Sequence, residues 1–402
     1  MVDYRPIPDE REVFHEYRSY AFRPEEGVPP YDPEEHENPR ATRGARRGVY
    51  ADDGDERPRT VCRHYWLEAR VRGDAHPTAG LASVATPPEY RRDGYVRRLL
   101  KRSLAEYRDR GDRFSVLWPF QYRFYRTYGW DTANRIATHA FEPSVLSFAR
   151  GADAGGSFRP LEADDYEDLE PAYGAASEGL ALERDEEWWR HRVFGGHDVD
   201  PFVYAYDRGG EVAGYLVYRI EDEGDGRTLR VSELTAADRD ALLALLAFCA
   251  DHDSQVGRIE LRVSRTVPIR DLAMDPDEIE TTVVDGPMVR LVDVAETLPA
   301  LSLPDASAAL TLAVEDPLVD WNDGAFALEA ANGRLTCDRL GGASEADPDA
   351  TLEIGALSRL AVGARSATAL ERTGRLEAAD PDVVSTLESL FPETDVYFGE
   401  YF

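Results

Sequence analysis

The stretch LASVATPPEYRRDGYVRRLLKRSLAEYRDRGDRFSVLWPFQYRFYRTYGW, residues 81–130, decides the fold of this chain. Its first six residues form a predicted strand that a Pro-Pro pair stops, because proline has no N–H for a strand ladder. From Tyr95 the apolar side chains recur at helical spacing, and Gly111 closes the predicted helix. A second strand at 114–117 and a tyrosine-rich turn follow. The predicted order is therefore strand, cationic turn, amphipathic helix, strand and turn.

The cationic turn, Arg91-Arg92-Asp93-Gly94, precedes this predicted helix. The first N–H groups of a helix have no intrahelical partner and lie at the positive end of its dipole, so they can bind a pyrophosphate. Gly94 lets a phosphate approach the backbone closely because it has no side chain. Taken alone, the turn fits an ordinary solvated helix start with exposed arginines better than it fits a binding site. The neighbouring strands and the tyrosine-rich turn shift the interpretation toward an anion-binding site.

The charge of the chain is unevenly distributed. The net charge is −31, yet residues 1–140 carry 25 Lys and Arg against 23 Asp and Glu, and the remaining residues carry 21 against 54. An anionic ligand of the first part explains this difference. Nucleic acid is not the expected ligand, because no recognition helix and no aromatic stacking platform accompanies the basic residues. Lys101 is the only lysine, and the acidity indicates a salt-loving source.

The segment resembles the GNAT N-acetyltransferases, whose acetyl-CoA motif reads Arg/Gln-x-x-Gly-x-Gly/Ala. Arg91, Gly94 and Val96 fall on this motif, and Val96 departs from it because a branched side chain replaces Gly or Ala. The combination of VATPPEYRRDGYVR, FYRTYGW, two further domains and an aromatic C-terminus is similar to the Eis-like (enhanced intracellular survival) acetyltransferases. The resemblance implies acetyl-CoA as cosubstrate, a primary amine as the small-molecule acceptor, and a homo-oligomer such as a hexamer.

The predicted fold class is α+β, with two tandem GNAT domains followed by a sterol carrier protein-like domain. The expected boundaries are 1–148, 149–285 and 286–402. The second domain repeats the strand-then-helix opening and contains a hairpin signal, but no Arg-x-x-Gly turn lies between 234 and 255. We therefore expect this copy to be degenerate and unable to bind CoA. Residues 23–60 are rich in Pro, Gly and charge, which predicts a long loop, either bordering the acceptor site or without a role.

The resemblance also implies which residues carry the chemistry. Tyr125 is the expected general acid, because it lies four residues before Gly129 in the family's Tyr-x-x-Phe/Tyr-Gly pattern. From the residues alone, Tyr122, Tyr125 and Tyr128 are equally compatible with a packed aromatic stripe. In the family, the C-terminal carboxylate, here that of Phe402, reaches the catalytic site. The expected cofactor-binding residues are Val84, Thr86, Arg91, Arg92, Gly94, Tyr95 and Val96.

Proton transfer explains why such residues are needed. An amine with a pKa near ~10.4 is mostly protonated at neutral pH, so a base must take its proton. A free carboxylate is a weak base, but burial beside Tyr401 and Phe402 would raise its pKa. A tyrosine can donate a proton to the departing thiolate. A backbone N–H between Val84 and Thr86 would polarise the thioester oxygen.

Other features bound the remaining function classes. Cys62, Cys249 and Cys337 lie far apart, and His191 and His197 lack partners at zinc spacing, so neither disulfides nor a metal site is expected. No run approaches the ~20 apolar residues of a membrane span. The N-terminus carries acids where a signal peptide needs bases, which predicts a cytoplasmic protein. A lipid carrier and a CoA-responsive scaffold without turnover remain the rival functions.

Overall fold

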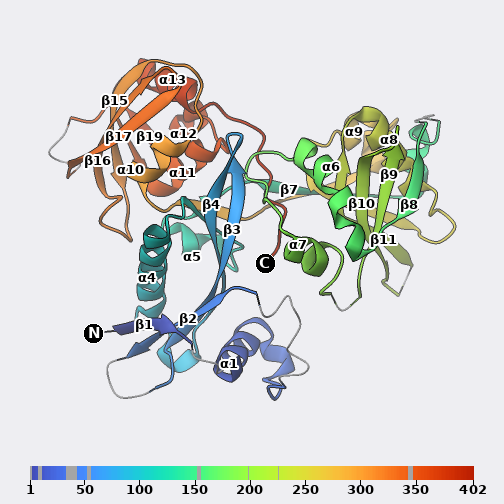
Figure 1. The fold of residues 1–402 in the computed structure, drawn as a ribbon, viewed down its shortest axis with the longest axis horizontal. Coiled ribbons are helices and arrows are strands. Elements are labelled where there is room, and N and C mark those ends of the chain that lie inside the picture. Colours follow the sequence, from blue (N-terminus) through green and yellow to red (C-terminus); the bar gives the residue numbers. More distant parts are fainter. Residues whose placement is uncertain are drawn as a thin grey trace. The chain divides into compact units, whose positions relative to one another are not determined.

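The computed structural model describes residues 2–7, 11–32, 43–51, 56–151, 155–197, 199–224, 226–342 and 347–402. The chain divides into two compact units (Figure 1). Unit 1 comprises residues 1–134, 179–183 and 287–402, and unit 2 comprises residues 135–178 and 184–286. Each unit contains a seven-stranded sheet, and unit 1 contains a further five-stranded sheet. The predicted α+β class is confirmed, because helices and sheets occur together in both units.

The first sheet has the strand order β1-β2-β3-β4-β5-β14-β6. Only the β4–β5 pair is parallel among its described ladders. The helices of this part are α1 (Arg11–Phe22), α4 (Tyr95–Arg110) and α5 (Tyr122–Arg126). The strands are β1 (Val2–Pro6), β2 (Ala45–Ala51), β3 (Thr60–Val71), β4 (Asp74–Ala85), β5 (Phe114–Leu117), β6 (Asp131–Thr132) and β14 (Met288–Leu291).

Helix α4 forms as its sequence predicts. It begins after Gly94 and ends at Gly111, where a φ of +83° favours a residue without a side chain. Its apolar stripe is buried against strands of the first sheet. Each fully buried leucine contributes roughly 2 kcal/mol to the free energy of folding. The residues of this cluster under α4 include Cys62, Ala79, Leu81, Leu99, Leu100, Leu104, Tyr107, Leu117, Tyr125 and Trp130.

Two local predictions need correction. The segment 23–60, expected to be one long loop, contains strand β2, which pairs with both β1 and β3. Because of its two arginines and central glycine, the sequence pattern of β2 did not indicate a strand. The strand is stabilised by its two neighbours. Residues 33–42 and 52–55 of that segment lie outside the described residues. The strand predicted from Leu81 begins earlier, at Asp74, because a polar first half pairs with β3.

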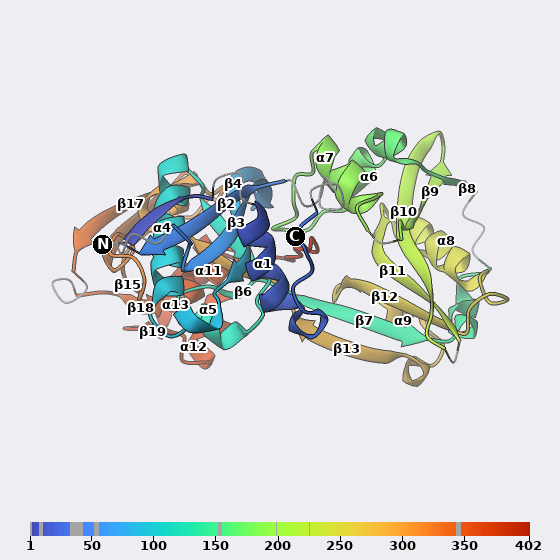
Figure 2. The ribbon, with the colours of Figure 1, turned by 90° about the horizontal axis from the view of Figure 1, so that it is seen from below.

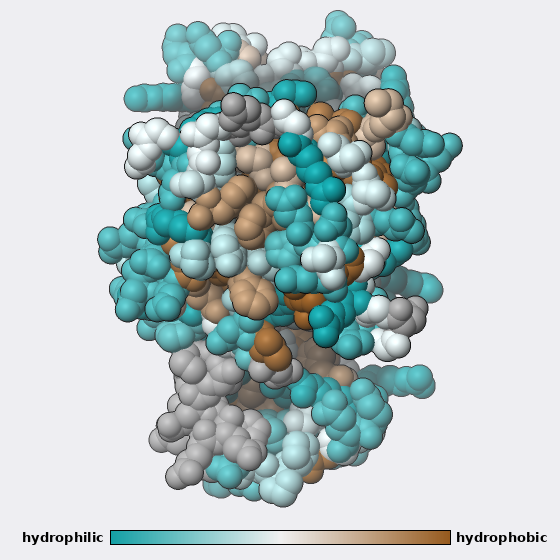
Figure 3. All heavy atoms as spheres, turned by 90° about the vertical axis from the view of Figure 1, so that its right-hand side faces the viewer, coloured by the Kyte–Doolittle hydropathy of each residue, from teal (hydrophilic) through white to brown (hydrophobic). Residues whose placement is uncertain are grey.

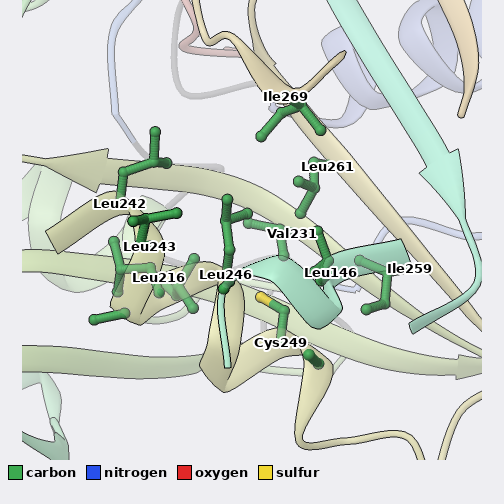
Figure 4. Packing of buried hydrophobic residues seen from close by; sticks show 14 of the residues in the cluster. Leu146, Leu216, Val231, Leu242, Leu243, Leu246, Cys249, Ile259, Leu261 and Ile269 are labelled. Atoms are coloured by element: carbon green, nitrogen blue, oxygen red, sulfur yellow. The ribbon is translucent and has the colours of Figure 1, made fainter. Parts of the chain in front are cut away.

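Unit 2 is built around a sheet of order β13-β7-β12-β11-β10-β9-β8, and Figure 2 shows β13 beside β7. The leucine-rich helix α8 packs on β10, β11 and β12 in the core drawn in Figure 4. The hairpin signal is confirmed by β9 and β10. The elements are β7 (Arg135–Phe141), β8 (Ser157–Pro160), α6 (Glu170–Ala176), α7 (Glu186–Trp188), β9 (Phe202–Arg208), β10 (Glu211–Asp222), β11 (Arg227–Ala236), α8 (Arg239–Ala250), β12 (Arg258–Ser264), α9 (Ile269–Leu272) and β13 (Glu280–Asp285).

The last part of the chain forms a five-stranded sheet of order β17-β16-β15-β18-β19. Its final helix is α13, Pro381–Leu390, which Asp380 caps through the amide of Asp382. Among the elements, α11 packs on β14 and β6 of the first sheet, within unit 1. The elements are α10 (Val294–Thr297), β15 (Ala308–Glu315), β16 (Gly324–Ala331), β17 (Arg334–Gly341), β18 (Ala350–Glu353), α11 (Ile354–Val362), α12 (Ala367–Arg372), β19 (Leu376–Ala378) and α13 (Pro381–Leu390).

Two strands lie in sheets that their place in the sequence does not suggest. Strand β14, which follows unit 2 along the chain, pairs with β5 and β6 in the first sheet. Strand β7, which precedes most of unit 2, pairs with β12 and β13 in the second sheet. The sequence pattern indicates a strand at each place, but it does not specify the partner because strand pairing is non-local.

The composition is visible on the molecular surface. Hydrophilic side chains cover most of the face shown in Figure 3, and apolar residues gather near its centre. Such a surface fits a chain whose Asp and Glu, 77 in number, exceed its 46 Lys and Arg. In high salt, the Debye length falls to about 3 Å at 1 M, so repulsion between these carboxylates is largely screened.

A buried polar cluster lies between α4 and the first sheet. The Nε2 atom of His64 is 3.1 Å from Ser103 Oγ and 3.2 Å from Cys62 Sγ, and its Nδ1 is 3.6 Å from Glu106. Glu106 also accepts hydrogen bonds from Tyr4 and Arg47. Burial lowers the pKa of His64 from 6.5 to about 3. The imidazole is therefore neutral in the folded protein at neutral pH.

We expect this cluster to make the first sheet acid-sensitive. Below pH 6.5 the unfolded chain protonates His64 while the folded protein does not, so the free energy of unfolding falls until about pH 3. The pKa difference corresponds to at most ~5 kcal/mol. In His64→Gln this part of the slope disappears, which denaturant melts between pH 7 and pH 4 would measure. An equal slope in both proteins would contradict the assignment.

Candidate functional site

Strands β4 and β5 separate near the start of α4. They pair in parallel from Thr78 and Phe114 to Leu81 and Leu117, and β4 then continues to Ala85 paired with β3 but not with β5. We call this opening the fork. Ser83 lies in the continuing part with a φ of +53°, and the register against β3 shifts there. A bulge of this kind re-aims backbone groups. Within the fork, the backbone of Val84 has no partner strand on the edge of β4 where β5 pairs with Thr78 to Leu81.

The start of α4 has the properties of an anion site. Gly94 is its N-cap, with a φ of +76° and no side-chain cap, and a Cβ there would meet nothing within 4 Å. Without a side-chain cap, the first amides of α4 are available to donate to a ligand. Arg91 and Arg92 are exposed beside them, and Arg91 Nε donates to the carbonyl of Thr86 at 3.0 Å. That bond ties the turn to the end of β4.

The remaining predicted cofactor residues are arranged around this start. The hydroxyl of Thr86 donates to Thr60 at 2.8 Å, so this side chain is bound within the protein. The side chains of Tyr95 and Val96 pack against the cluster under α4. The branched side chain of Val96 thus contributes to the helix–sheet packing, which gives its departure from the motif a structural use.

The structure distinguishes the three tyrosines of the turn. Tyr125 is buried with 4% exposure, whereas Tyr122 and Tyr128 are partly exposed. The ring of Tyr125 lies at centroid distances of 5.2 Å from Phe124 and 5.6 Å from Phe120. Its hydroxyl has no hydrogen-bond partner in the described part of the chain. Burial raises the pKa of this phenol, so it is protonated at neutral pH and can donate a proton.

The C-terminal tail, residues 395–402, contacts residues that follow strands β5 and β6 of the first sheet. Phe398 is fully buried, and its N–H donates to Asn134 Oδ1 at 3.0 Å. Trp118, the residue after β5, donates from Nε1 to the carbonyl of Glu400 at 2.5 Å. The tail therefore ends beside the fork. Phe402 is only partly exposed there, but Tyr401 is 64% exposed, so the burial expected beside both rings is wrong for Tyr401.

The last residue packs on strand β4. The ring of Phe402 lies 5.1 Å from the ring of Tyr65, and a Cβ at Gly80 would come within 2.8 Å of it. Gly80 is thus a close-approach glycine in a strand interior. The signal for this contact in the sequence is an isolated glycine one residue before the predicted strand. Tyr65, Trp118 and Asn134 were also missed, because nothing in their local sequence links them to the tail.

Tyr125 and Phe402 lie on opposite faces of the first sheet. Ala79 and Leu81 belong to the same apolar cluster as Tyr125, whereas Gly80, between them, faces Phe402. Side chains alternate along a strand, so these two faces are distinct. The fork begins at the next residues of β4. A molecule threaded through the fork would therefore be accessible from both sides, with the phenol on one side and the last residue on the other.

The start of helix α8 in unit 2 is capped by a carboxylate. The N-cap of α8 is Asp238, whose carboxylate accepts from the amide of Ala241 at 2.9 Å and pairs with Arg208. These contacts lower the pKa of Asp238 to about 2. A negative charge therefore already caps this helix and would repel a phosphate. The two adjacent tryptophans, Trp188 and Trp189, are fully buried and serve packing.

Among the described residues, no group of three or more His, Cys, Asp or Glu is arranged to hold a metal ion. No helix in the described part of the chain is long and apolar enough to cross a membrane.

Comparison with known proteins gives three family matches along the chain. Residues 4–133 and 180–291 each match an acetyltransferase (GNAT) domain, and residues 294–399 match a sterol carrier protein domain. An N-acetyltransferase from Streptomyces avermitilis is 28% identical, over 80% of this chain and 79% of that protein. The N-acetyltransferase Eis of Mycobacterium tuberculosis is 27% identical, over 78% of each chain. The crystal structure of Eis1 from Mycobacterium abscessus superposes with a TM-score of 0.79 and 25% identity, covering all of both chains.

Proposed function

We propose that this chain, which belongs to the Eis-like GNAT N-acetyltransferases, transfers the acetyl group of acetyl-CoA to a primary amine of a small cationic or peptide-like acceptor. The chain is an acyltransferase, and acetyl-CoA is the cosubstrate of its family. The acceptor, and the residues that serve as acid and base, are the proposed parts. One observation supports the proposal most directly: the uncapped start of α4, the fork between β4 and β5 and the chain's C-terminus lie together.

The cosubstrate is proposed to bind across the start of α4. The free amides after Gly94 and the cationic side chains of Arg91 and Arg92 match a pyrophosphate in charge and in hydrogen-bonding capacity. The thioester arm then lies in the fork, where the backbone near Val84 supplies a donor for the carbonyl oxygen. Thr86, Tyr95 and Val96 shape this seat through the contacts described above.

Tyr125 and the carboxylate of Phe402 are the proposed acid and base. The amine loses a proton to the carboxylate, directly or through a water, and its nitrogen attacks the thioester carbon. The tetrahedral intermediate collapses as the C–S bond breaks, and the leaving sulfur takes the proton of the Tyr125 phenol. The nitrogen then loses its remaining extra proton, which returns to the Tyr125 phenolate through water, and the carboxylic acid of Phe402 releases its proton to solvent. The raised pKa of Tyr125 keeps that proton available. The placement of the two residues on opposite faces of the fork supports this division of roles.

The acceptor is proposed to be a cation because the chain after residue 140 carries 54 acidic and only 21 basic side chains. Such a surface raises the local concentration of cations at low salt. The domain division at 148 and 285 likewise stays a proposal, with the first domain binding acetyl-CoA and the third delivering the carboxylate.

The test is an acceptor panel in high salt. Purified protein with acetyl-CoA should release free CoA thiol when given polyamine-like or aminoglycoside-like amines, and should not do so with alcohols of similar size. Binding of acetyl-CoA with no CoA release for any primary amine would contradict the proposal and favour the scaffold function. Lipid copurifying in near-stoichiometric amount, without acetyl-CoA binding, would favour the lipid carrier.

A further inference from the structure

The side chain of Arg290, in strand β14, is fully buried and holds the turn that follows α5. Its Nη1 donates a hydrogen bond to the carbonyl of Tyr128, and its Nη2 pairs with the fully buried carboxylate of Asp316. The guanidinium carbon lies 5.2 Å from the ring centroid of Trp130. At Gly129, whose φ is +89°, a Cβ would lie 1.8 Å from Nη1. Arg290 therefore contacts all three residues of the turn.

This turn is bonded directly to Tyr125. The carbonyl of Tyr125 accepts hydrogen bonds from the amides of Tyr128 at 2.9 Å and of Trp130 at 3.3 Å. The rings of Tyr125 and Trp130 also contact each other at a centroid distance of 6.4 Å. A shift of residues 128–130 would therefore move Tyr125 as well.

The other end of the arginine is held by the third domain. Asp316 follows β15, and its Oδ1 accepts from the amides of Leu318 at 2.9 Å and Val319 at 3.2 Å. Its carboxylate is thus fixed before it meets Arg290. One guanidinium joins the turn after Tyr125 to the sterol carrier protein-like domain. Burying such a pair adds little net stability, because desolvation offsets the attraction, and its best-attested use is to fix one arrangement.

We propose that Arg290 and Asp316 are positioning residues for acetyl transfer, through which the third domain holds the Tyr125 hydroxyl in the place where it meets the departing sulfur. This inference rests on the proposed role of Tyr125. In this proposal the third domain positions Tyr125 as well as the C-terminal tail.

Arg290→Lys tests the proposal, because lysine keeps the charge but has one donor group and cannot span both partners. We expect kcat to fall about 10- to 100-fold, as a misplacement of ~1 Å can cost ~10²-fold. The KM for acetyl-CoA should stay within about twofold, since this residue does not touch the start of α4. In a Tyr125→Phe background, Arg290→Lys should lower kcat by less than about twofold, because the group it positions is already gone.

A matched control lies in the same unit. Arg108 pairs with Asp293 at 2.6 Å and lies over the ring of Trp321 at 5.0 Å, so it also links the first sheet's helix to the third domain, but away from Tyr125. Arg108→Lys should keep kcat. If Arg108→Lys lowers kcat as much as Arg290→Lys does, the positioning proposal is wrong. It is also wrong if Arg290→Lys lowers kcat by the same factor in the wild-type and the Tyr125→Phe backgrounds. Neither result would affect the proposed role of Tyr125. An unchanged rate in Tyr125→Phe would remove the proposed acid and this inference with it. If Arg290→Lys does not fold, Asp316→Asn serves in the same design, and failure of both to fold would overturn the positioning role.

Discussion

Replacing Tyr125 by phenylalanine should lower kcat about 10²- to 10⁴-fold, which is the range expected for the loss of a general acid. The substitution removes one hydroxyl and leaves the ring packed between Phe120 and Phe124. Because that hydroxyl has no hydrogen-bond partner among the described residues, its removal should leave the melting temperature nearly unchanged. Initial rates of CoA release at saturating acetyl-CoA and acceptor measure the effect.

Tyr122→Phe is the matched control for this prediction. Tyr122 belongs to the same short helix and is partly exposed, so the loss of its hydroxyl should change kcat by less than about twofold. A pH profile adds a second readout. Burial raises the pKa of Tyr125, so the wild-type phenol keeps its proton across the neutral range and kcat should not decline there from its ionisation. Wild-type activity in Tyr125→Phe would exclude this residue from the mechanism.

Adding one glycine after Phe402 should reduce kcat at least ~10²-fold, because it moves the terminal carboxylate by up to ~3.5 Å without changing any side chain. The ring of Phe402 can keep its contacts with Tyr65 and Gly80, and Trp118 can still bind the carbonyl of Glu400. The extended protein should therefore fold and bind acetyl-CoA as the wild type does. Turnover and acetyl-CoA affinity, measured on the same preparation, separate the two effects.

A second variant tests whether the ring or the carboxylate matters. Phe402→Leu keeps the carboxylate at its position and retains an apolar side chain over Gly80, so we expect most of the activity to remain. Full activity of the glycine-extended chain would show that the base lies elsewhere. A large loss in Phe402→Leu with an active extended chain would make the tail a packing element only.

Helix α4 and its surroundings were predictable because their signals are local. A Pro-Pro stop, an apolar stripe and Gly111 lie within one short stretch, and each acts on its own neighbours. The same is true of the hairpin at the Gly209-Gly210 turn and of the Asp380 cap before α13. For these elements the structure agrees with the sequence because local propensity and tertiary packing favour the same conformation.

The candidate site was predictable only in part. The Arg91–Gly94 turn is a local motif, and the structure gives it the expected uncapped helix start. The residues alone could not distinguish Tyr125 from Tyr122 and Tyr128, because all three share one spacing. Burial distinguishes them only in the folded protein. Strand β2 was missed because its arginines are typical of an edge strand or a loop. In the structure it pairs with a neighbouring strand on each side.

Local patterns in the sequence specify where the helices and most strands form, and they place cationic side chains beside an uncapped helix start. Three other features come from the folded chain: β14 returns to the first sheet, Arg290 reaches the turn after Tyr125, and the last residue lies on Gly80. The physical reason is the range of the interactions. Periodicity and capping act within one or two helical turns, whereas these contacts join residues more than 100 positions apart, whose meeting depends on how whole sheets pair and bury their faces.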